Sequence, residues 1–368
     1  MNYLAFRNLW QGKFQLALSI GGVALSIMLI LVLNGFLAGI YKQITAYLDN
    51  TPADLVIAQD GVTNLLSATS VIPSSTENSI HSIPGIESIV PIISQFVILD
   101  IHDKKVVAYL VGYDTDEGGG PWKLIAGHEP KDDDEIVLDW VMAEEHGFVI
   151  GDTLKLIDEE FTIVGLSDET NSWMASFIFI QKRAAEQLLL LPDTTSFILI
   201  SLKPGVDRNT IISRLEPRLQ DVEIVPVENM KQNDLDLLVE VFAIPLRMMV
   251  SIAFTVGTAI LGMVIYTATV ERQREYGVLK AVGGKNKHLY RLVIIQGLAT
   301  AIGGVLLGIG LAQLATNWIM TIYPKFLIVL ELDSVITTSI AGVLMGLLAA
   351  ILPARQVARL DPAEVFRK

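Results

Sequence analysis

The sequence predicts a membrane protein with four transmembrane α-helices and one mixed α/β extracytoplasmic domain inserted between helices 1 and 2. The 368-residue chain is 51% hydrophobic and only 18% charged, whereas a soluble domain usually carries about 25% charge. Four segments contain no Asp, Glu, Lys, Arg or His. Each is long enough to cross a hydrocarbon core, which takes about 20 apolar residues. These segments are 14–41, 248–270, 292–324 and 334–354.

The first apolar segment follows "MNYLAFRNLWQGK", which carries two positive charges and no negative one. A secretory signal begins in the same way, but its apolar region runs for only about 7–15 residues. The run at 14–41 is nearly twice as long. We therefore expect an uncleaved anchor, with a cytoplasmic N-terminal segment at 1–15 and transmembrane helix 1 at 16–40.

Residues 41–243 predict an extracytoplasmic α/β domain with a helical stalk. Strands are indicated by "ADLVIAQ", "IVPIISQFVILDI", "KVVAYLVGYD" and "SFILISL", and by "IGDTLKLIDEEFTIVGL", which favours two strands joined at Asp158-Glu159. "KRAAEQLLLLP" and "DRNTIISRLEPRL" favour short helices, the second with Asp207 as its N-cap. The flanking "YKQITAYLDN" and "VENMKQNDLDLLVEVFAIPLRM" read as helices. They either form a stalk or merely cap their membrane spans.

The rest of the chain predicts three further spans with short connections. We expect transmembrane helix 2 at 246–270, a cytoplasmic segment at 271–291 and transmembrane helix 3 at 292–318. A short external loop at 319–333, transmembrane helix 4 at 334–354 and a cytoplasmic tail at 355–368 complete the chain.

Charge predicts the orientation of these segments. Segments 1–15, 271–291 and 354–368 together carry twelve Lys/Arg and four acids, whereas 41–243 carries 13 Lys/Arg and 34 Asp/Glu. Positive residues in short loops are retained in the cytoplasm. We therefore expect a protein of the bacterial cytoplasmic membrane, with both termini on its cytoplasmic side and the acidic domain on its outer side. The net charge of −13 then belongs to an exported domain and does not indicate a nucleic-acid partner.

The spans contain two kinds of unusual residue. Glycines four residues apart place small side chains on one helix face, where helix backbones can approach closely. A few polar side chains either line a path or hydrogen-bond between helices. The glycines are Gly35, Gly39, Gly304, Gly308, Gly342 and Gly346, and the polar residues are Asn34, Gln296, Gln313 and Asn317.

The sequence lacks the residues that most membrane chemistry needs. The cores of the spans carry no charged side chain, which argues against an ion-coupled transporter or proton pump. Cysteine is absent, which excludes disulfides and thiolate chemistry. "AVGGKNK" is not a phosphate loop, because Asn286 stands where Ser or Thr would hold Mg²⁺. Histidines are scattered, and "DTDEGGG" has Gly118 at the fifth position of a calcium loop. We expect no catalytic residue, metal or cofactor in this chain.

The segment "ERQREYGVLKAVGGKNKHLYRL" at 271–292 predicts a short charged helix after span 2. Glu271 and Glu275 favour a helix N-terminus and Lys280 favours its C-terminal end, while Gly277 interrupts the helix. Gly283-Gly284 supplies the stop. An ordinary basic loop held by anionic lipid remains the alternative.

"ERQREYGVLKAVGG" resembles the E-R-x-x-E-x-G-x-L-K-A-x-G signature of the MacB/FtsX-like permeases of ATP-binding cassette (ABC) transporters. "YLAFRNLWQGKFQLALSIGGVALSI" is similar to the N-terminal segment of that family, and "LPARQVARLDPAEVFR" to its closing P-A-R-x-x-A-x-x-x-P-x-E-x-x-R. "DEIVLDWVMAEEHGFVIGDTLKL" resembles its extracytoplasmic domain. By length and compact outer domain, the chain looks closest to the haem-efflux and DevC-like permeases.

The resemblance implies a permease homodimer docked on a separate cytosolic ABC ATPase dimer, which binds the ATP and Mg²⁺. ATP-driven closure would move the outer domains and extrude a hydrophobic or amphiphilic substrate. A periplasmic adaptor and membrane lipids are further implied partners. The ATPase would couple to the 271–283 helix through Glu271, Arg272, Arg274, Glu275, Gly277, Lys280 and Gly283.

The chain departs from the resemblance at Gln296, where family members often carry Glu. This difference puts any role of that acid in coupling or packing in doubt. The resemblance also leaves a second function open. The chain would then be a mechanotransmitting regulator of an extracytoplasmic cell-wall hydrolase or sensor, without substrate transport. An exporter should respond to a lipophile, and a regulator to a protein partner.

Overall fold

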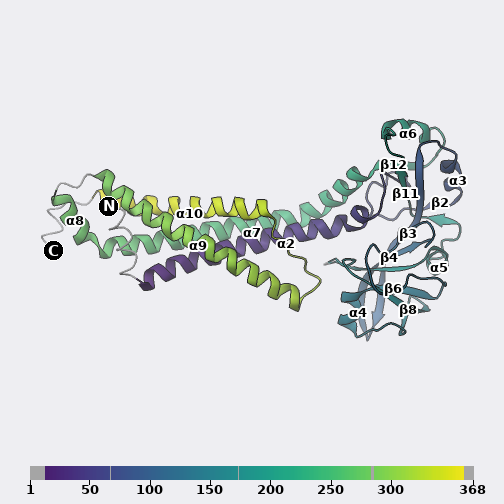
Figure 1. Ribbon diagram of the computed structural model, residues 1–368, viewed down its shortest axis with the longest axis horizontal. Coiled ribbons are helices and arrows are strands. Elements are labelled where there is room, and N and C mark those ends of the chain that lie inside the picture. Colours follow the sequence, from purple (N-terminus) through teal and green to yellow (C-terminus); the bar gives the residue numbers. More distant parts are fainter. Residues whose placement is uncertain (1–12, 67, 173, 283–285, 360–368) are drawn as a thin grey trace. The chain divides into compact units, whose positions relative to one another are not determined.

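The computed structural model describes residues 13–66, 68–172, 174–282 and 286–359 (Figure 1). Within these residues the chain forms two compact units. The helical unit comprises the chain up to Gly39, Phe242–Tyr323 and the chain from Ile328 onward. The α/β unit comprises Ile40–Val241 and Pro324–Leu327.

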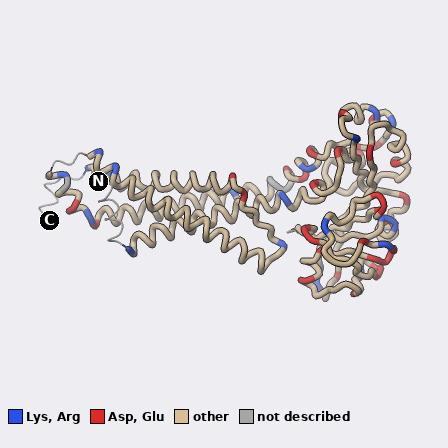
Figure 2. The backbone as a smooth tube through the Cα atoms, in the orientation of Figure 1, with Lys and Arg blue, Asp and Glu red and all other residues tan. Residues whose placement is uncertain are grey.

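Four helices of the described chain are long and apolar enough to cross a membrane. Their apolar stretches lie in α2 (Lys13–Asn50), α7 (Val227–Glu271), α9 (Asn286–Ile322) and α10 (Leu332–Ala358). Figure 2 shows that Lys, Arg, Asp and Glu are sparse along these stretches and gather near their ends. A short helix, α8 (Gln273–Ala281), follows α7. The protein is thus a membrane protein with one α/β domain between the first span and the other three.

Glycines let the long helices of the helical unit pack closely. A Cβ atom added at Gly304 would lie 2.5 Å from Val23 Cβ, and one at Gly346 would lie 2.5 Å from Ala301 Cβ. A Cβ atom at Gly308 would likewise collide with Ala24 O, one at Gly342 with Val305 and one at Gly35 with Ile328; Gly39 is buried. Five of the six glycines singled out by spacing therefore stand where a side chain would collide with a neighbouring element.

The α/β unit is built on one large mixed sheet with the strand order β12-β1-β11-β3-β4-β9-β6-β8-β5, while β7 pairs with β8. A second, small sheet pairs β2 (Ile72–Pro73) with β10 (Thr194–Thr195). The strands of the large sheet are β1 (Leu55–Gln59), β3 (Ile86–Ile101), β4 (Lys104–Tyr113), β5 (Leu124–Gly127), β6 (Glu135–Asp139), β7 (Thr153–Leu156), β8 (Glu159–Ser167), β9 (Ser176–Gln181), β11 (Phe197–Leu202) and β12 (Val222–Pro226).

The longest strand, β3, joins two halves of this sheet. Its residues from Ile86 to Ile92 pair with β11, and its residues from Ile93 to Ile101 pair with β4. The helices of the unit lie beside these strands. They are α3 (Ser75–His81), α4 (Trp140–His146), α5 (Lys182–Leu188) and α6 (Arg208–Leu215).

The ends of the two long helices that enter the α/β unit belong to its core. Tyr47 of α2 is buried, its ring stacks on Phe177 at 6.0 Å, and its hydroxyl donates to Gly119 O at 2.7 Å. Val227 and Met230 of α7 are buried in the same hydrophobic cluster. The helical segments predicted as a stalk therefore pack against the sheet and do more than cap their spans.

Several boundaries differ from the sequence-based expectation. The turn expected at Asp158-Glu159 lies one residue earlier, because Ile157 takes the left-handed conformation and β8 already begins at Glu159. Helix α9 begins at Asn286, inside the predicted segment 271–291, and continues to Ile322, inside the predicted loop 319–333. Asp207 caps α6 as expected, since its carboxylate accepts from Thr210 N at 3.0 Å.

Candidate coupling site

The junction of α7 and α8 is set by one residue that leaves the helical conformation. α7 ends at Glu271, and Arg272 takes φ −102° and ψ 15° as the N-cap of α8. Tyr276 N then donates to Arg272 O at 3.2 Å. The charged segment is therefore a separate helix that starts after a backbone break, and Gly277 lies within this helix without ending it.

Two side-chain hydrogen bonds tie this junction to distant parts of the helical unit. Gln15 Nε2, near the start of α2, donates to Glu271 Oε2 at 2.5 Å. Lys280 Nζ, in the last turn of α8, donates to Ala358 O at the end of α10 at 2.8 Å. A charged donor makes the second bond stronger than an ordinary neutral one. The first bond joins the end of α7 to the first membrane helix, and the second joins α8 to the last membrane helix.

Tyr276 anchors α8 in the apolar core of the helical unit. Its side chain is 3% exposed and clusters with Leu289, Ala354 and Val357 of the neighbouring helices. Burial raises the pKa of its hydroxyl above the ordinary value, so the ring stays neutral at cellular pH. Arg274 and Glu275 lie on the exposed side of α8. The helix therefore has one face fixed in the protein and one charged face open to a partner.

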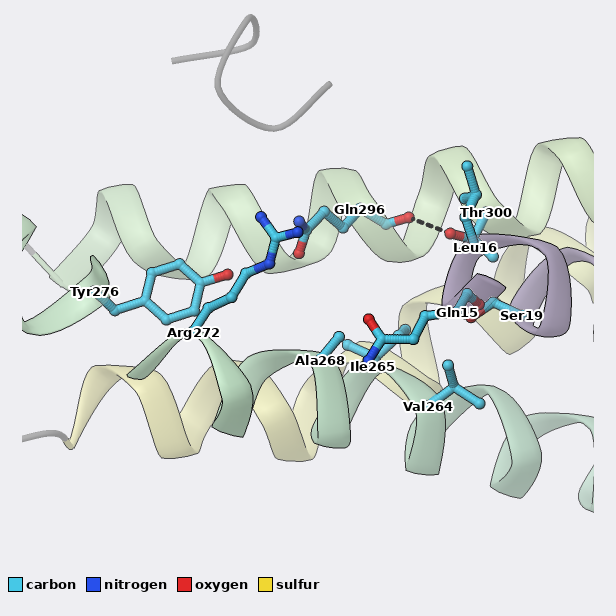
Figure 3. A pocket seen from close by; sticks show the side chains of 10 residues that line it. All are labelled: Gln15, Leu16, Ser19, Val264, Ile265, Ala268, Arg272, Tyr276, Gln296 and Thr300. Carbon is cyan, nitrogen blue, oxygen red and sulfur yellow. Dashed lines mark hydrogen bonds between the residues drawn. The ribbon is translucent and has the colours of Figure 1, made fainter. Parts of the chain in front are cut away.

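A small cavity of about 50 Å³ with both polar and apolar walls lies beside the junction (Figure 3). Arg272 and Gln296 both line it, and in Figure 3 the two side chains point into it. Within its walls Ser19 Oγ donates to Gln15 O at 2.8 Å, and Thr300 Oγ1 donates to Gln296 O at 2.9 Å. The volume is sufficient for water. Gln296, flagged by sequence as a departure from the family pattern, thus belongs to the surroundings of the predicted coupling residues.

The structure brings most of the predicted coupling residues together around α8. Glu271, Arg272 and Lys280 make the contacts described above, Arg274 and Glu275 are exposed, and Gly277 is buried; Gly283 lies outside the described residues. Gln15 and Tyr276 were missed by sequence reasoning. Tyr276 carried a usable signal, because it is an aromatic residue on the face of a charged helix opposite Glu275 and Arg274.

Two of the other polar residues of the spans bond to each other within one helix. Gln313 Nε2 donates to Asn317 Oδ1 at 3.1 Å, four residues along α9. In the described parts of the chain, no group of three or more His, Asp or Glu side chains is placed to hold a metal ion.

A helical unit of four candidate membrane helices with a short charged helix between two of them, joined to one α/β domain, is the arrangement that the family comparison explains. Two family models match the chain: a MacB-like periplasmic core domain over residues 16–218 and an FtsX-like permease C-terminal domain over residues 247–362. The chain belongs to the MacB/FtsX-like permease family of ABC transporters.

Curated relatives agree with this family. A protein of Staphylococcus haemolyticus named as hemin transport system permease protein HrtB is 23% identical over 92% of this chain and 91% of its own length. A macrolide export ATP-binding/permease protein MacB of Shewanella oneidensis is 25% identical over 81% of this chain and 49% of its own length. An ABC transporter permease of Mycobacterium tuberculosis, Rv0072, is 21% identical over the whole chain.

Among solved structures, the periplasmic region of MacB from Actinobacillus actinomycetemcomitans is similar to this chain. The match spans 49% of this chain and 92% of the solved one, with 17% identity and a TM-score of 0.39. The extracellular domain of the ABC-type transporter YknZ covers 47% of this chain and 98% of its own, with 10% identity and a TM-score of 0.37.

Proposed function

We propose that this chain is the permease subunit of an ABC exporter and that a separate cytosolic ATPase dimer drives it through α8. The permease itself would hold no ATP or Mg²⁺ and would carry no catalytic residue. The substrate would be hydrophobic or amphiphilic and would be moved by the α/β domain on the outer side of the membrane. Two copies of the chain would form the working permease, and a periplasmic adaptor is a further candidate partner.

One observation carries this proposal: α8 is held on one face and charged on the other. Tyr276 and Lys280 fix its position against the membrane helices, and the Gln15–Glu271 bond holds the end of α7 just before it. Arg274 and Glu275 remain exposed. A force applied to that exposed face would therefore reach α9 and α10 directly and α2 through the end of α7, which is what coupling to a separate motor requires.

The charge distribution supports the orientation that coupling needs. The basic segments would lie in the cytoplasm with the ATPase, and the acidic α/β domain outside, in a bacterial cytoplasmic membrane. The polar-poor spans favour a substrate that is taken up from the membrane or from its outer side over one that crosses an aqueous channel. The names of the relatives, hemin transport and macrolide export, are consistent with an amphiphilic cargo.

The proposal is tested by purifying the full chain from its native membrane in a mild detergent and identifying the proteins that accompany it. We expect a stoichiometric ABC ATPase, whose hydrolysis rate rises when the permease is present in lipid nanodiscs. An amphiphile that raises this rate further would support export. Stimulation by a protein partner alone would favour the mechanotransmitting regulator. If no ATPase accompanies the chain, even after crosslinking at exposed positions of α8, the coupling role of α8 is wrong.

A further inference from the structure

The α/β unit contains an apolar cavity. This cavity, of about 370 Å³, is lined by side chains from both helical stalk segments and three strands. We call it the apolar chamber and define it by Ile44 of α2, Phe96 of β3, Tyr109 of β4, Met174, Phe177 of β9 and Leu237 of α7. Its volume lies in the range of small-molecule sites, which is about 300–1,000 Å³.

The chamber exposes apolar side chains together on one wall. Phe96 is 36% exposed, Met174 43% and Leu237 50%. Behind them the aromatic wall is tightly packed, since the rings of Phe96 and Tyr109 are 4.8 Å apart and those of Tyr109 and Phe177 are 5.2 Å apart. Covering such surface is favourable, because it removes apolar area from water. The preformed wall therefore favours an apolar occupant.

A second cavity, of about 310 Å³, shares the wall residues Ser172, Met174 and Ala175 with the chamber. We call it the basic groove, because Lys104, Lys105 and Lys325 line it. Except for Lys325, its lining residues, which include the acid Glu145, belong to segment 41–243, whose 13 Lys/Arg and 34 Asp/Glu give a net charge of −21. This concentration of positive charge is therefore a local exception, and it adjoins the apolar chamber.

The cations of the groove are not all neutralised by the protein. Lys105 pairs with Asp100 and Lys325 pairs with Glu145, whereas Lys104 makes no ion pair among the residues that the structure describes. His146 also lines the groove, and its Nε2 atom is buried without a hydrogen-bond partner. Burial lowers the pKa of His146; Glu145 opposes this shift, whereas Lys325 and Lys104 add to it. The groove thus offers an unpaired cation and a vacant imidazole nitrogen.

The wall between the two cavities is held in place. Ser172 Oγ donates to Ala175 O at 2.8 Å and accepts from Ala175 N at 3.1 Å, which closes the loop that carries Met174. Gln43 Nε2 lies 3.3 Å from Asn171 Oδ1 and 3.1 Å from Lys325 O. The stalk thereby fixes both this loop and the backbone that carries Lys325.

We propose that the apolar chamber and the basic groove together bind a small anionic amphiphile. Its apolar body occupies the chamber between Phe96, Met174 and Leu237, and its carboxylate or phosphate group lies at Lys104 and His146. This inference rests on the proposed export function and names the chemical class of the substrate. Asp234, which also lines the chamber, does not call for a cationic ligand, because its carboxylate already accepts from Leu65 N at 3.2 Å and Leu66 N at 3.1 Å.

The test measures ligand binding to the full chain in nanodiscs without any ATPase. The probe is a dansyl-labelled undecanoic acid, compared with its methyl ester and with the amine of the same length. We expect saturable binding of the acid and about tenfold weaker binding of the ester, because one charge-assisted contact is lost. Lys104→Glu should weaken binding of the acid about tenfold and leave binding of the ester unchanged. Phe96→Asp should weaken binding of both probes.

Lys155→Glu is the matched control, because it makes the same charge change at an exposed strand residue outside both cavities. The proposal is overturned if the acid and the ester bind equally, if the amine binds best, or if Lys155→Glu matches the effect of Lys104→Glu. It is also overturned if Met174→Cys, in this chain without native cysteines, forms a disulfide between two copies in high yield, because a second copy then covers the chamber. Binding is measured without the motor, so these failures leave the ATPase-coupling proposal standing.

Discussion

The ammonium group of Lys280 donates to the carbonyl oxygen of Ala358 at 2.8 Å, which joins the last turn of α8 to the last turn of α10. The two residues are 78 positions apart in the chain. Carbonyl groups in the last turn of a helix lack partners within that helix, and a cation near that end also interacts favourably with the helix dipole. This one contact makes the position of α8 depend on the C-terminal end of the helical unit.

Lys280→Met should loosen α8 while keeping most of the apolar side chain. A hydrogen bond to a charged group contributes about 1.5–3 kcal/mol, so the opening of α8 should become at least severalfold more frequent. Hydrogen exchange of residues 273–281 in nanodiscs measures this change. Lys280→Arg keeps the donor and should exchange like the native chain. Unchanged exchange in Lys280→Met would show that the bond does not hold α8.

Glu275→Lys should uncouple the partner ATPase from the permease without unfolding the chain. Glu275 is exposed on α8, so reversing its charge changes the partner-facing surface and no buried contact. We expect the chain to retain its melting temperature but to lose its stimulation of ATP hydrolysis. Glu216→Lys, an equal charge reversal at an exposed residue of the α/β unit, serves as control. Native stimulation in Glu275→Lys would remove Glu275 from the coupling surface.

Gly304→Ala should destabilise the helical unit, whereas Gly310→Ala should not. A Cβ at Gly304 would lie 2.5 Å from Val23 Cβ, but one at Gly310 meets nothing within 4 Å. Overpacking costs about 1–3 kcal/mol, while alanine at an open helical position gains up to about 1 kcal/mol. Thermal unfolding in detergent compares the two variants on the same helix. Equal melting temperatures would mean that close packing at Gly304 contributes little.

Acidic pH should stabilise the α/β unit through Asp139. Its side chain is fully buried, it caps α4 by accepting from Val141 N at 3.0 Å, and burial raises its pKa to about 6. A carboxyl group whose pKa is raised on folding contributes stability that is fully present below its unfolded pKa of 3.8 and lost as pH rises through about 6.

The check compares native chain and Asp139→Asn, since Asn also caps helices well. As pH falls from about 7.5 to about 5, the native chain should gain stability relative to this variant, by up to about 1.4 kcal/mol for each unit that the pKa is raised. Melting curves of the α/β unit at both pH values give this difference. A constant difference between the two proteins would show that Asp139 does not titrate in this range.

The sequence predicted the membrane helices and the longest strands, because their signals are local. A run without charge as long as 334–354 has few alternatives to a membrane helix, and strands such as β4 and β11 are rich in β-branched residues. The sequence analysis did not identify β6 and β9. They are buried on both faces, so they lack the alternation by which a half-buried strand is recognised.

The candidate site could be predicted in part. The charge pattern located α8 and its exposed acids, and the resemblance assigned them a role in coupling. The break at Arg272 and the bonds Gln15–Glu271 and Lys280–Ala358 could not be foreseen. The two bonds join residues that are 256 and 78 positions apart. No local sequence pattern encodes such a contact.

Strand β3 makes the large sheet of the α/β unit continuous, which its separate hydrophobic cores would not do by themselves. Because one continuous strand pairs with β11 up to Ile92 and with β4 from Ile93, the two halves of the sheet share a single backbone. Splitting the gene at this point would cut β3 in two and would separate β1 from β11 and β12, its neighbours in the sheet. The domain therefore has no internal seam, and it should deform, unfold and reassemble as one body.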